Sequence, residues 1–547
     1  MKNLDSLKIS LENLCKNLKL DEEILFQIAN DNDFDLQINN FVKYQNFTNT
    51  VQLNAEIKKI ISKDENILDF QITPNYFINL KLNLKNFINV FENIESYLIS
   101  DKVTKIILDY GGPNIGKPLH VGHLRSLNIG RSLYKINEYA GNKVLSDIHL
   151  GDWGMPVAQI IGYCDLKNIN IKKISIEELE IIYPQASKLY EKDKEFMILC
   201  QEINQLLNKQ NEEIVLKWKQ IKKVSLQSIK NRLKELDHSF DLWFGESDVN
   251  NLIPQMLEDF KKQKKISYDK GAYISNEVTD PKILITKSDG SYLYLTTDLA
   301  TFLHRVKNNN FDKTLYVVDK RQSLHFKQLI SSTKYFGFED KDLEHVSFGT
   351  VNDIKGNPFK TREGGTKQLK ELFIETCDHI KKINSNLDND SVEILANTVL
   401  TYSDLITNRK TDYKFDLERF TSINGKTGIY VQYALVRAKK LVIDSMINFN
   451  EETINLSVIE NCDKDLLRSF LKFEKYFELA ISNNEPHYLA DYLYELSNLY
   501  NAIYQSENIL NNKDNDKKIS KILISKLFIN YSSLLMDMLG IRPVEKM

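Results

Sequence analysis

The sequence predicts an α/β protein in which a parallel-sheet domain lies between a small α+β segment and an all-helical C-terminal segment. Three observations lead to this prediction. Strand-like and helical patterns mix before residue 100, buried-strand patterns alternate with helices over residues 101–424, and helical periodicity alone continues from residue 425. The 547 residues, of which 42% are hydrophobic, are enough for several cores. We expect domains at residues 1–100, 101–424 and 425–547.

Composition excludes some classes of protein. The five cysteines are scattered without metal-ligand spacing, which indicates free thiols and no resident metal. The N-terminus lacks an apolar signal segment, and no apolar stretch approaches the length that spans a membrane. Basic and acidic residues number 72 and 75, so a nucleic-acid partner would have to be bound by local patches. We expect a cytoplasmic protein that does not contact membranes.

A βαβ unit is predicted near the start of the central domain. The apolar run at residues 106–108 is typical of a buried parallel strand, and the glycines and proline at 111–113 end it. Apolar residues then recur at spacings of three and four up to Gly141, which indicates a helix, and the next apolar run begins at residue 144. Loops that follow parallel strands are where such folds bind ligands.

The loop between this strand and helix allows two interpretations. Its glycines and Lys117 match the spacing of a P-loop, but Pro118 stands where that motif needs a hydroxyl group to ligate magnesium. The second interpretation places His120 and His123 at the helix start, where two imidazoles and the positive helix end can bind a phosphate chain. Gly122 between them would let an adenine lie against the backbone. Two histidines on a solvated helix end are the alternative explanation.

The run PNIGKPLHVGHLRS, residues 113–126, resembles the HIGH signature of class I aminoacyl-tRNA synthetases in the form that arginyl-tRNA synthetases have. The resemblance implies a Rossmann-type class I catalytic domain. It also implies ATP-dependent activation of L-arginine to arginyl-adenylate and transfer of arginine to the 3′-terminal ribose of tRNA(Arg), with Mg²⁺ accompanying ATP. Residues 149–154, HLGDWG, resemble the segment that borders the active site in this family.

Residues 160–280 form an expected insert in the central domain. They are mostly helical and charged, for example at 212–236, and carry no recognisable catalytic group. They resemble the connective insert that class I synthetases place between the two halves of the nucleotide fold. Their short length predicts that the protein has no editing site.

The second half of the nucleotide-binding fold is expected to begin with the apolar run at residues 283–285. Tyr294 and Asp298 follow at i and i+4. Both can point into one pocket if a helix begins at Thr296 or Thr297. Taken alone, Asp298 could equally be a helix N-cap.

The family resemblance assigns an arginine pocket to these residues. It implies that Tyr294, Asp298 and Asp109 hold the guanidinium, and that Asn114 and Gln322 bind the α-amino end of the substrate. A guanidinium offers five donors in a rigid fork and requires planar acceptors, which two aspartates supply. Asp109 could instead belong to an Asx turn at the end of its strand.

Two positions near this pocket depart from the family pattern. The apolar strand at residues 315–318 ends in DKRQ, residues 319–322, where Lys320 replaces a serine. Gly112 also stands where the family has a serine. One side-chain hydrogen bond to the substrate is therefore in question at Gly112.

Residues 351–365, VNDIKGNPFKTREGG, resemble the substitute for the KMSKS loop in this family. Lys360, Thr361 and Arg362 put two cations and a hydroxyl on a glycine-flanked loop suited to closing over a pyrophosphate leaving group. A surface hairpin with solvated charges is the alternative. Because the second lysine of a full motif is absent, the resemblance implies that Lys117 compensates for it. The implied catalytic residues are His120, His123, Lys117, Lys360 and Arg362.

The N-terminal segment resembles the domain with which arginyl-tRNA synthetases touch the tRNA elbow. It combines helical patterns, such as residues 11–20, with the strand-like stretch 77–84. Phe77 and Asn79 match the RNA-reading strand best, although a small core with one solvated amide would give the same pattern.

The segment from residue 425, which follows a stem at about 350–424, resembles the anticodon-binding bundle of the family. Tyr500 and Tyr504 lie at i and i+4, so both rings share a helix face and could stack a splayed base. An aromatic stripe in a helical core is the alternative. Met547 matches the family's C-terminus and is expected at the same surface.

Two other classes of function stay open. One is a different enzyme with the HxGH motif, such as the cysteine or glutamate member of class I or another nucleotidyltransferase. The other is a non-catalytic RNA-binding paralogue, against which the intact His120, His123, Asp298 and Lys360 argue. We expect a monomeric enzyme.

Overall fold

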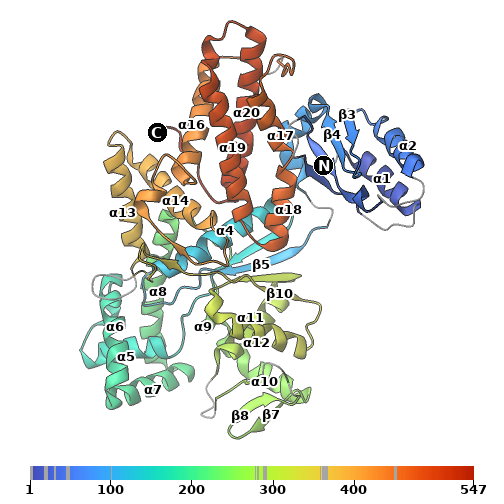
Figure 1. Cartoon of the computed structure of the whole chain (residues 1–547). Coiled ribbons are helices and arrows are strands. Elements are labelled where there is room, and N and C mark those ends of the chain that lie inside the picture. Colours follow the sequence, from blue (N-terminus) through green and yellow to red (C-terminus); the bar gives the residue numbers. More distant parts are fainter. Residues whose placement is uncertain are drawn as a thin grey trace. The chain divides into compact units, whose positions relative to one another are not determined.

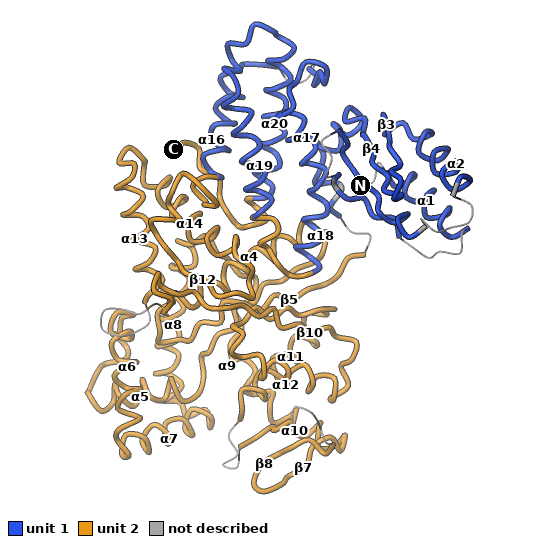
Figure 2. Tube along the Cα trace, viewed as in Figure 1, with its two compact units in different colours: residues 1–99, 431–482, 491–535 blue, residues 100–430, 483–490, 536–547 orange. Residues whose placement is uncertain are grey.

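The computed structural model of the chain describes residues 4–17, 23–29, 33–44, 50–99, 102–277, 279, 283–287, 292–357, 359, 367–448 and 452–547. These residues divide into two units (Figure 2). Unit 1 contains residues 1–99, 431–482 and 491–535, and unit 2 contains residues 100–430, 483–490 and 536–547. The division into three domains remains a prediction.

A four-stranded parallel sheet forms the centre of unit 2 (Figure 1). Its order is β10-β9-β5-β6, so β5 and β9 are neighbours although an insert separates them in the chain. The strands span Lys105–Tyr110 (β5), Lys143–Asp147 (β6), Lys313–Val317 (β9) and Asp342–His345 (β10). This sheet confirms the predicted α/β class and brings the carboxyl ends of four strands to one edge, where such folds bind ligands.

Helix α4, Leu124–Tyr139, connects β5 to β6 as predicted, and buried polar contacts anchor it to helix α14, Asn389–Leu405. Arg125 Nε lies 2.8 Å from a carboxylate oxygen of Asp404, and both side chains are almost fully buried. One turn and a half further along α4, Arg131 donates to the hydroxyl of Thr401 at 2.9 Å. The loss of one partner from a buried ion pair is strongly destabilising, so these contacts fix the orientation of α4.

The insert between β6 and β9 is mostly helical, as predicted. Helices α5 to α8 share an apolar core that includes Val157, Ile160, Ile203 and Ile221. A two-stranded hairpin, β7-β8, follows the last helix of the insert. The elements are α5 Met155–Leu166, α6 Ile176–Lys192, α7 Lys194–Asn208, α8 Glu212–Glu235, α9 Glu246–Val249, α10 Ile253–Lys262, β7 Ile266–Asp269 and β8 Ala272–Ser275.

The remaining elements of unit 2 are the helices on either side of β9 in the sequence and the stem at about residues 350–424. Helices α11, Tyr294–Asn309, and α12, Ser323–Tyr335, flank β9 in the sequence and join one apolar cluster through residues such as Leu299 and Leu329. In the stem, β11 pairs in parallel with β12. The stem elements are β11 Val351–Asn352, α13 Leu369–Ile383, α14, β12 Tyr413–Lys414 and α15 Leu417–Phe420.

The N-terminal part of unit 1 is a four-stranded antiparallel sheet with helices, as the α+β prediction requires. Its order is β1-β2-β4-β3. Asn79 lies on β4, where it is buried and accepts a hydrogen bond from Gln37 Nε2 at 2.6 Å. The elements are α1 Asp5–Asn17, β1 Phe26–Ile28, β2 Leu36–Ile38, α2 Thr50–Ile61, β3 Ile67–Ile72, β4 Ile78–Leu82 and α3 Ile88–Glu92.

The C-terminal helices form the expected bundle, but the two tyrosines differ in environment. Tyr500 is fully buried and stacks on Phe528 with ring centroids 4.2 Å apart, so its ring is a core residue and is not available to a base. Tyr504 is 36% exposed. The helices are α16 Gly428–Ser445, α17 Asn461–Phe470, α18 Phe473–Asn483, α19 His487–Ser506 and α20 Asn515–Met538.

Helix α20 corrects one expectation from the sequence. Among the described residues it is the helix long and apolar enough to cross a membrane by length and composition, although no such stretch was expected. Its most apolar window is 72% buried inside the protein. This burial is typical of the core helix of a bundle.

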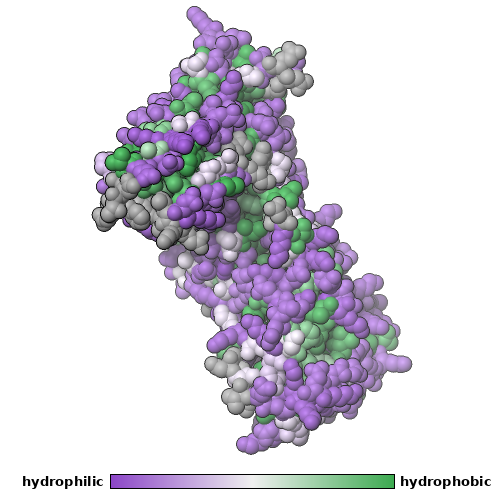
Figure 3. Space-filling model, turned by 90° about the vertical axis from the view of Figure 1, so that its right-hand side faces the viewer, coloured by the Kyte–Doolittle hydropathy of each residue, from purple (hydrophilic) through white to green (hydrophobic). Residues whose placement is uncertain are grey.

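On the face drawn in Figure 3, hydrophobic residues form separate patches among polar ones.

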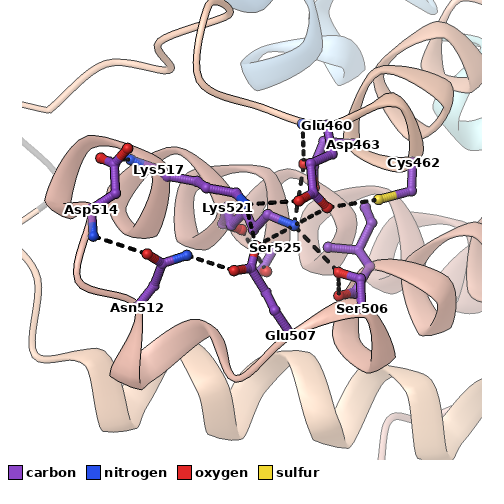
Figure 4. Close-up of polar contacts among 11 residues, drawn as sticks. Glu460, Cys462, Asp463, Ser506, Glu507, Asn512, Asp514, Lys517, Lys521 and Ser525 are labelled. Atoms are coloured by element: carbon purple, nitrogen blue, oxygen red, sulfur yellow. Dashed lines mark hydrogen bonds and ion pairs between the residues drawn. The ribbon is translucent and has the colours of Figure 1, made fainter.

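A buried lysine holds three parts of unit 1 together (Figure 4). The side chain of Lys521 on α20 is fully buried, and its Nζ lies 2.8 Å from Glu507 and 3.3 Å from both Glu460 and Asp463. Lys517, one turn earlier, binds Glu460 at 2.7 Å and Glu507 at 3.1 Å. The network therefore joins α20 to the start of α17 and to the segment after α19.

Replacing Lys521 with methionine should destabilise the protein by about 3 to 5 kcal/mol, because Asp463 and its neighbours would lose the charge that balances them inside the bundle. Urea unfolding followed by circular dichroism measures the effect. Lys518→Met is the matched control, because Lys518 lies on the same helix and forms no ion pair among the described residues. Equal unfolding midpoints for the two variants would contradict a stabilising role of the network.

Candidate active site

The two predicted histidines cap the start of α4. His120 is the N-cap of the turn Val121–His123, and its Nδ1 accepts a hydrogen bond from the Gly122 N–H at 3.1 Å. The backbone N–H of His120 lies 3.1 Å from Nδ1 of His123, while the His120 carbonyl accepts from the His123 N–H at 2.9 Å. A neutral imidazole whose Nδ1 accepts carries its proton on Nε2. The Gly122 contact selects an Nε2–H donor on His120. Nδ1 of His123 also lies 3.2 Å from the His120 carbonyl, so either tautomer of His123 can bond to the cap. The two ring centroids lie 4.0 Å apart.

Both imidazoles are neutral at pH 7. Burial lowers the pKa of His123 to about 3, and the charges of His120 and Lys117 add to the effect. Burial also lowers the pKa of His120, together with the charges of Lys117 and Arg321. The site therefore offers a phosphate chain two neutral imidazoles beside the cations Lys117 and Arg321.

Gly122 is required by the cap itself. A Cβ atom at this position would lie 2.8 Å from Cε1 of His120, closer than side chains pack. The histidine ring thus occupies the space that a side chain at Gly122 would fill. The expected contact of Gly122 with an adenine stays a prediction.

The segment at residues 149–154 lies against the histidine loop. Asn114 pairs with Gly151 as an isolated parallel bridge, in which the Ile115 N–H donates to the Gly151 carbonyl at 3.1 Å. Gly112 is exposed, has φ of +46°, and has no atom within 4 Å of the position of a Cβ. The place where the family has a serine is therefore open space.

Asp109 does not present a free carboxylate. It neighbours Asp147 in the parallel register of β5 and β6, and Nη2 of Arg305 lies 2.5 Å from Asp109 and 2.6 Å from Asp147. The expected partner of Asp109 was the guanidinium of a substrate, but here the carboxylate binds a guanidinium of the chain itself. Asp109 also lies within β5, so it does not form an Asx turn at the strand end.

Asp298 lies among polar side chains. Helix α11 begins at Tyr294 with Leu293 as N-cap, two residues earlier than expected, so Asp298 lies inside the helix and is not its cap. The Asp298 carboxylate is 2.5 Å from Nε2 of His325 and 4.0 Å from Nε2 of His149. Its side chain is 27% exposed and Tyr294 is 74% exposed. Both residues are thus reachable by a ligand.

Glu246 is a candidate site residue that the sequence did not reveal. It is the first residue of α9, and Asp298, His149 and Tyr294 are among its electrostatic neighbours. Burial raises the pKa of Glu246 to about 7, and the charges of Asp298 and Asp152 contribute. A perturbed carboxyl group in a pocket is a common sign of a functional site. No motif surrounds Glu246, so only the fold brings it to this place.

The DKRQ segment continues from β9 at the same edge of the sheet. Gln322 ends the turn Lys320–Gln322 that precedes α12. Lys320 forms an ion pair with Asp412 at 2.8 Å, so the lysine that replaces a serine is bound to the stem. His325, three residues after Gln322, contacts Asp298 as described above.

Of the predicted phosphate loop, residues 351–365, the structure describes residues 351–357 and 359. Lys360, Thr361 and Arg362 lie outside the described residues. The backbone just after the loop is tied to the histidines, because Gln368 forms an antiparallel bridge with His120 and the Val121 N–H donates to the Lys367 carbonyl at 3.0 Å. Lys367 and Gln368, which follow the loop in the sequence, therefore lie next to the histidine cap.

Comparison with known proteins agrees with this geometry. Residues 87–417 match the family model of the catalytic domain of class I (R) tRNA synthetases, and residues 431–547 match the DALR anticodon binding domain. The arginine–tRNA ligase of Francisella tularensis subsp. holarctica is 33% identical over 90% of both chains. The chain belongs to the arginyl-tRNA synthetase family. The arginine–tRNA ligase of Alkaliphilus oremlandii is 36% identical, over 81% of this chain and 80% of that one.

The fold is also that of an arginyl-tRNA synthetase. The crystal structure of the enzyme from Plasmodium falciparum superposes with a TM-score of 0.78 at 23% identity, covering 100% of this chain and 98% of that one. This similarity confirms the predicted class I catalytic fold with a helical C-terminal domain.

The tautomers and pKa values of the two histidines can be measured directly. In protein labelled with ¹⁵N-histidine, long-range ¹H–¹⁵N spectra should show His120 as a neutral Nε2–H ring at pH 7. His123 should be neutral at pH 7 and still neutral at about pH 5, because burial disfavours its charged form. Gly122→Ala should disturb the His120 signals first, since the added Cβ meets that ring. A normal titration of His123 near pH 6.5 would contradict the proposed cap.

Proposed function

We propose that the site built by His120, His123 and Asp298 carries out the arginine–tRNA ligase reaction of this family. In this reaction the arginine carboxylate attacks the α-phosphate of ATP to give arginyl-adenylate and pyrophosphate, and the 3′-terminal ribose of tRNA(Arg) then takes the arginyl group. The single observation that carries the proposal is the pair of neutral imidazoles at the positive end of α4.

The phosphate end of the site works by charge stabilisation. His120 and His123 would donate to phosphate oxygens whose charge increases in the transition state, and neutral donors held by backbone hydrogen bonds need no reorganisation to do so. Lys117 adds a cation next to both rings. We assign Lys360 and Arg362 to the pyrophosphate on the basis of the family pattern. ATP is taken as its Mg²⁺ complex.

The arginine end of the site selects a guanidinium. We assign its recognition to Asp298, with Tyr294 at the pocket mouth and with Glu246 as the second carboxylate. Burial and the charge of Asp298 raise the pKa of Glu246, and a cationic ligand between the two carboxylates would relieve this repulsion. Asn114 and Gln322 remain assigned to the α-amino end. Asp109, whose carboxylate binds Arg305, is assigned to the support of the pocket wall.

The tRNA contacts are proposed for both flanking segments. Tyr504 is the better of the two tyrosine candidates, because it is partly exposed and the Arg437 guanidinium lies 5.2 Å from its ring centre. Arginine and aromatic planes are typical stacking surfaces for unpaired bases. Phe77 and Met547 are half-buried and stay candidates. Asn79 can bind tRNA through its side-chain oxygen only if the hydrogen bond from Gln37 breaks.

The cellular setting follows from the family. We propose a cytoplasmic, monomeric enzyme whose partners are arginine, ATP and tRNA(Arg). No separate metal site is proposed. Asp109, Asp147 and His149 could hold an ion by their spacing, but the guanidinium of Arg305 already neutralises the two carboxylates.

The test of this function is isotopic exchange between ATP and pyrophosphate with each of the twenty amino acids, with and without tRNA. Of the twenty amino acids, only arginine should support exchange. Exchange with another amino acid, or none under any condition, would overturn the assignment. The family pattern also leads us to expect that exchange depends on tRNA.

Replacement of His123 by alanine should lower kcat for adenylate formation by the equivalent of about 2.7 to 4 kcal/mol, because the transition state loses a preorganised donor. The Kd for arginine should stay within about twofold, since the histidine serves the phosphates. Pre-steady-state kinetics and calorimetry measure the two quantities. A raised Kd for arginine with unchanged kcat would contradict this role.

The KM for arginine should depend on the protonation of Glu246. Its pKa of about 7 means that the carboxyl group is protonated in acid and ionised in base, and only the ionised form attracts a guanidinium. The KM should therefore fall about tenfold as the pH rises from about 6 to about 8. Glu246→Gln should give a higher KM without this pH dependence. A wild-type pH profile in that variant would exclude Glu246 from the pocket.

Truncation of Tyr504 to alanine should raise the KM for tRNA, since a stacked base contributes about 1 to 3 kcal/mol. The constants for ATP and arginine should change little. Tyr500→Phe is the control: it keeps the buried ring and should leave tRNA binding unchanged. If Tyr504→Ala lowers the melting temperature and leaves the KM for tRNA unchanged, Tyr504 is a core residue.

A further inference from the structure

The connective insert touches the histidine loop through one cation–π contact. The ammonium group of Lys117 lies 4.1 Å from the centre of the Tyr183 ring, within the range in which a cation is attracted to the face of an aromatic ring. Tyr183 lies on α6, and both side chains are half-buried. The ring itself packs against the apolar core of the insert, so its position is set by that core.

A second contact holds α6 in the same place. Glu180, one turn before Tyr183, accepts a hydrogen bond from Gln368 Nε2 at 3.2 Å. Gln368 forms a backbone bridge with His120, the N-cap of the histidine turn. Helix α6 is thus attached to the loop on both sides of Leu119, by Lys117 on one side and through His120 on the other.

We infer that Tyr183 is a positioning residue for Lys117, whose ammonium group it holds beside His120 and His123. The inference rests on the proposed role of Lys117 at the phosphates of ATP, and it gives the insert a part in ATP use. Lysine has a flexible four-carbon stem and a compact charge, so its position depends on what the charge contacts. The structure describes no ion pair for Lys117, which makes the tyrosine ring its described anchor.

Two variants distinguish the contribution of the aromatic ring face of Tyr183 from that of its hydroxyl group. Tyr183→Phe keeps an aromatic face and should retain activity within about twofold, whereas Tyr183→Leu has similar bulk without a π face. The leucine variant should lower kcat/KM for ATP by about 3- to 30-fold, the range expected for a partly desolvated cation–π contact. The KM for arginine should not change. Tyr190→Leu is the matched control, because Tyr190 lies on the same helix and packs in a separate apolar cluster.

A double-mutant cycle with Lys117→Met shows whether Tyr183 acts through Lys117. If it does, Tyr183→Leu has no further effect once Lys117 is methionine. The inference is overturned if the losses in kcat/KM for ATP of the two single variants multiply in the double variant. It is also overturned if Tyr183→Phe is as impaired as Tyr183→Leu. Should Tyr183→Leu fail to fold by circular dichroism, Tyr183→Met replaces it in the cycle.

The same cycle distinguishes this inference from the proposed function. An impaired Lys117→Met with an unimpaired Tyr183→Leu overturns only the positioning role. A fully active Lys117→Met shows that Lys117 does not serve the phosphates, and both the role of Lys117 and the inference about Tyr183 then fail.

Discussion

The guanidinium of Arg305, buried between Asp109 and Asp147, is the contact on which the geometry of the active site depends. It joins the ends of β5 and β6 to helix α11 in one ion network with almost no exposure to solvent. A buried charge is tolerated only when it is paired, so the two strand ends and the helix cannot separate without a large loss of stability. Asp298 lies two turns before Arg305, on the same face of α11, so the network also directs Asp298 toward the pocket.

A second network holds the histidines in the same way. The turn that carries them continues directly into α4, and α4 is fixed by the buried pair of Arg125 and Asp404. The backbone then orients both rings, because the Nδ1 atom of each ring makes its hydrogen bonds within the cap. The neutral donors at one end of the site and the carboxylates at the other match the opposite charges of the two substrates, a phosphate chain and a guanidinium.

Local patterns in the sequence were sufficient for the first strand, the following helix and the histidine cap, because all of these interactions are close in sequence. The ion pair of Asp109 could not be predicted in this way, since its partner Arg305 is 196 residues away in the sequence. Glu246 was missed for the same reason. Tyr500 has the helical spacing of an exposed stripe, and only the packing of α20 against it shows that the ring is buried. The start of α11 was misplaced because Leu293, the N-cap, has none of the side chains that usually mark a cap.

We expect Asp298 to bind the substrate guanidinium while Arg305 keeps Asp109 occupied. A crystal structure of the protein with arginine and a non-hydrolysable ATP analogue tests this directly. The substrate guanidinium should lie at hydrogen-bonding distance from Asp298, with Arg305 still between Asp109 and Asp147. A substrate guanidinium bound to Asp109, with Arg305 displaced, would contradict it.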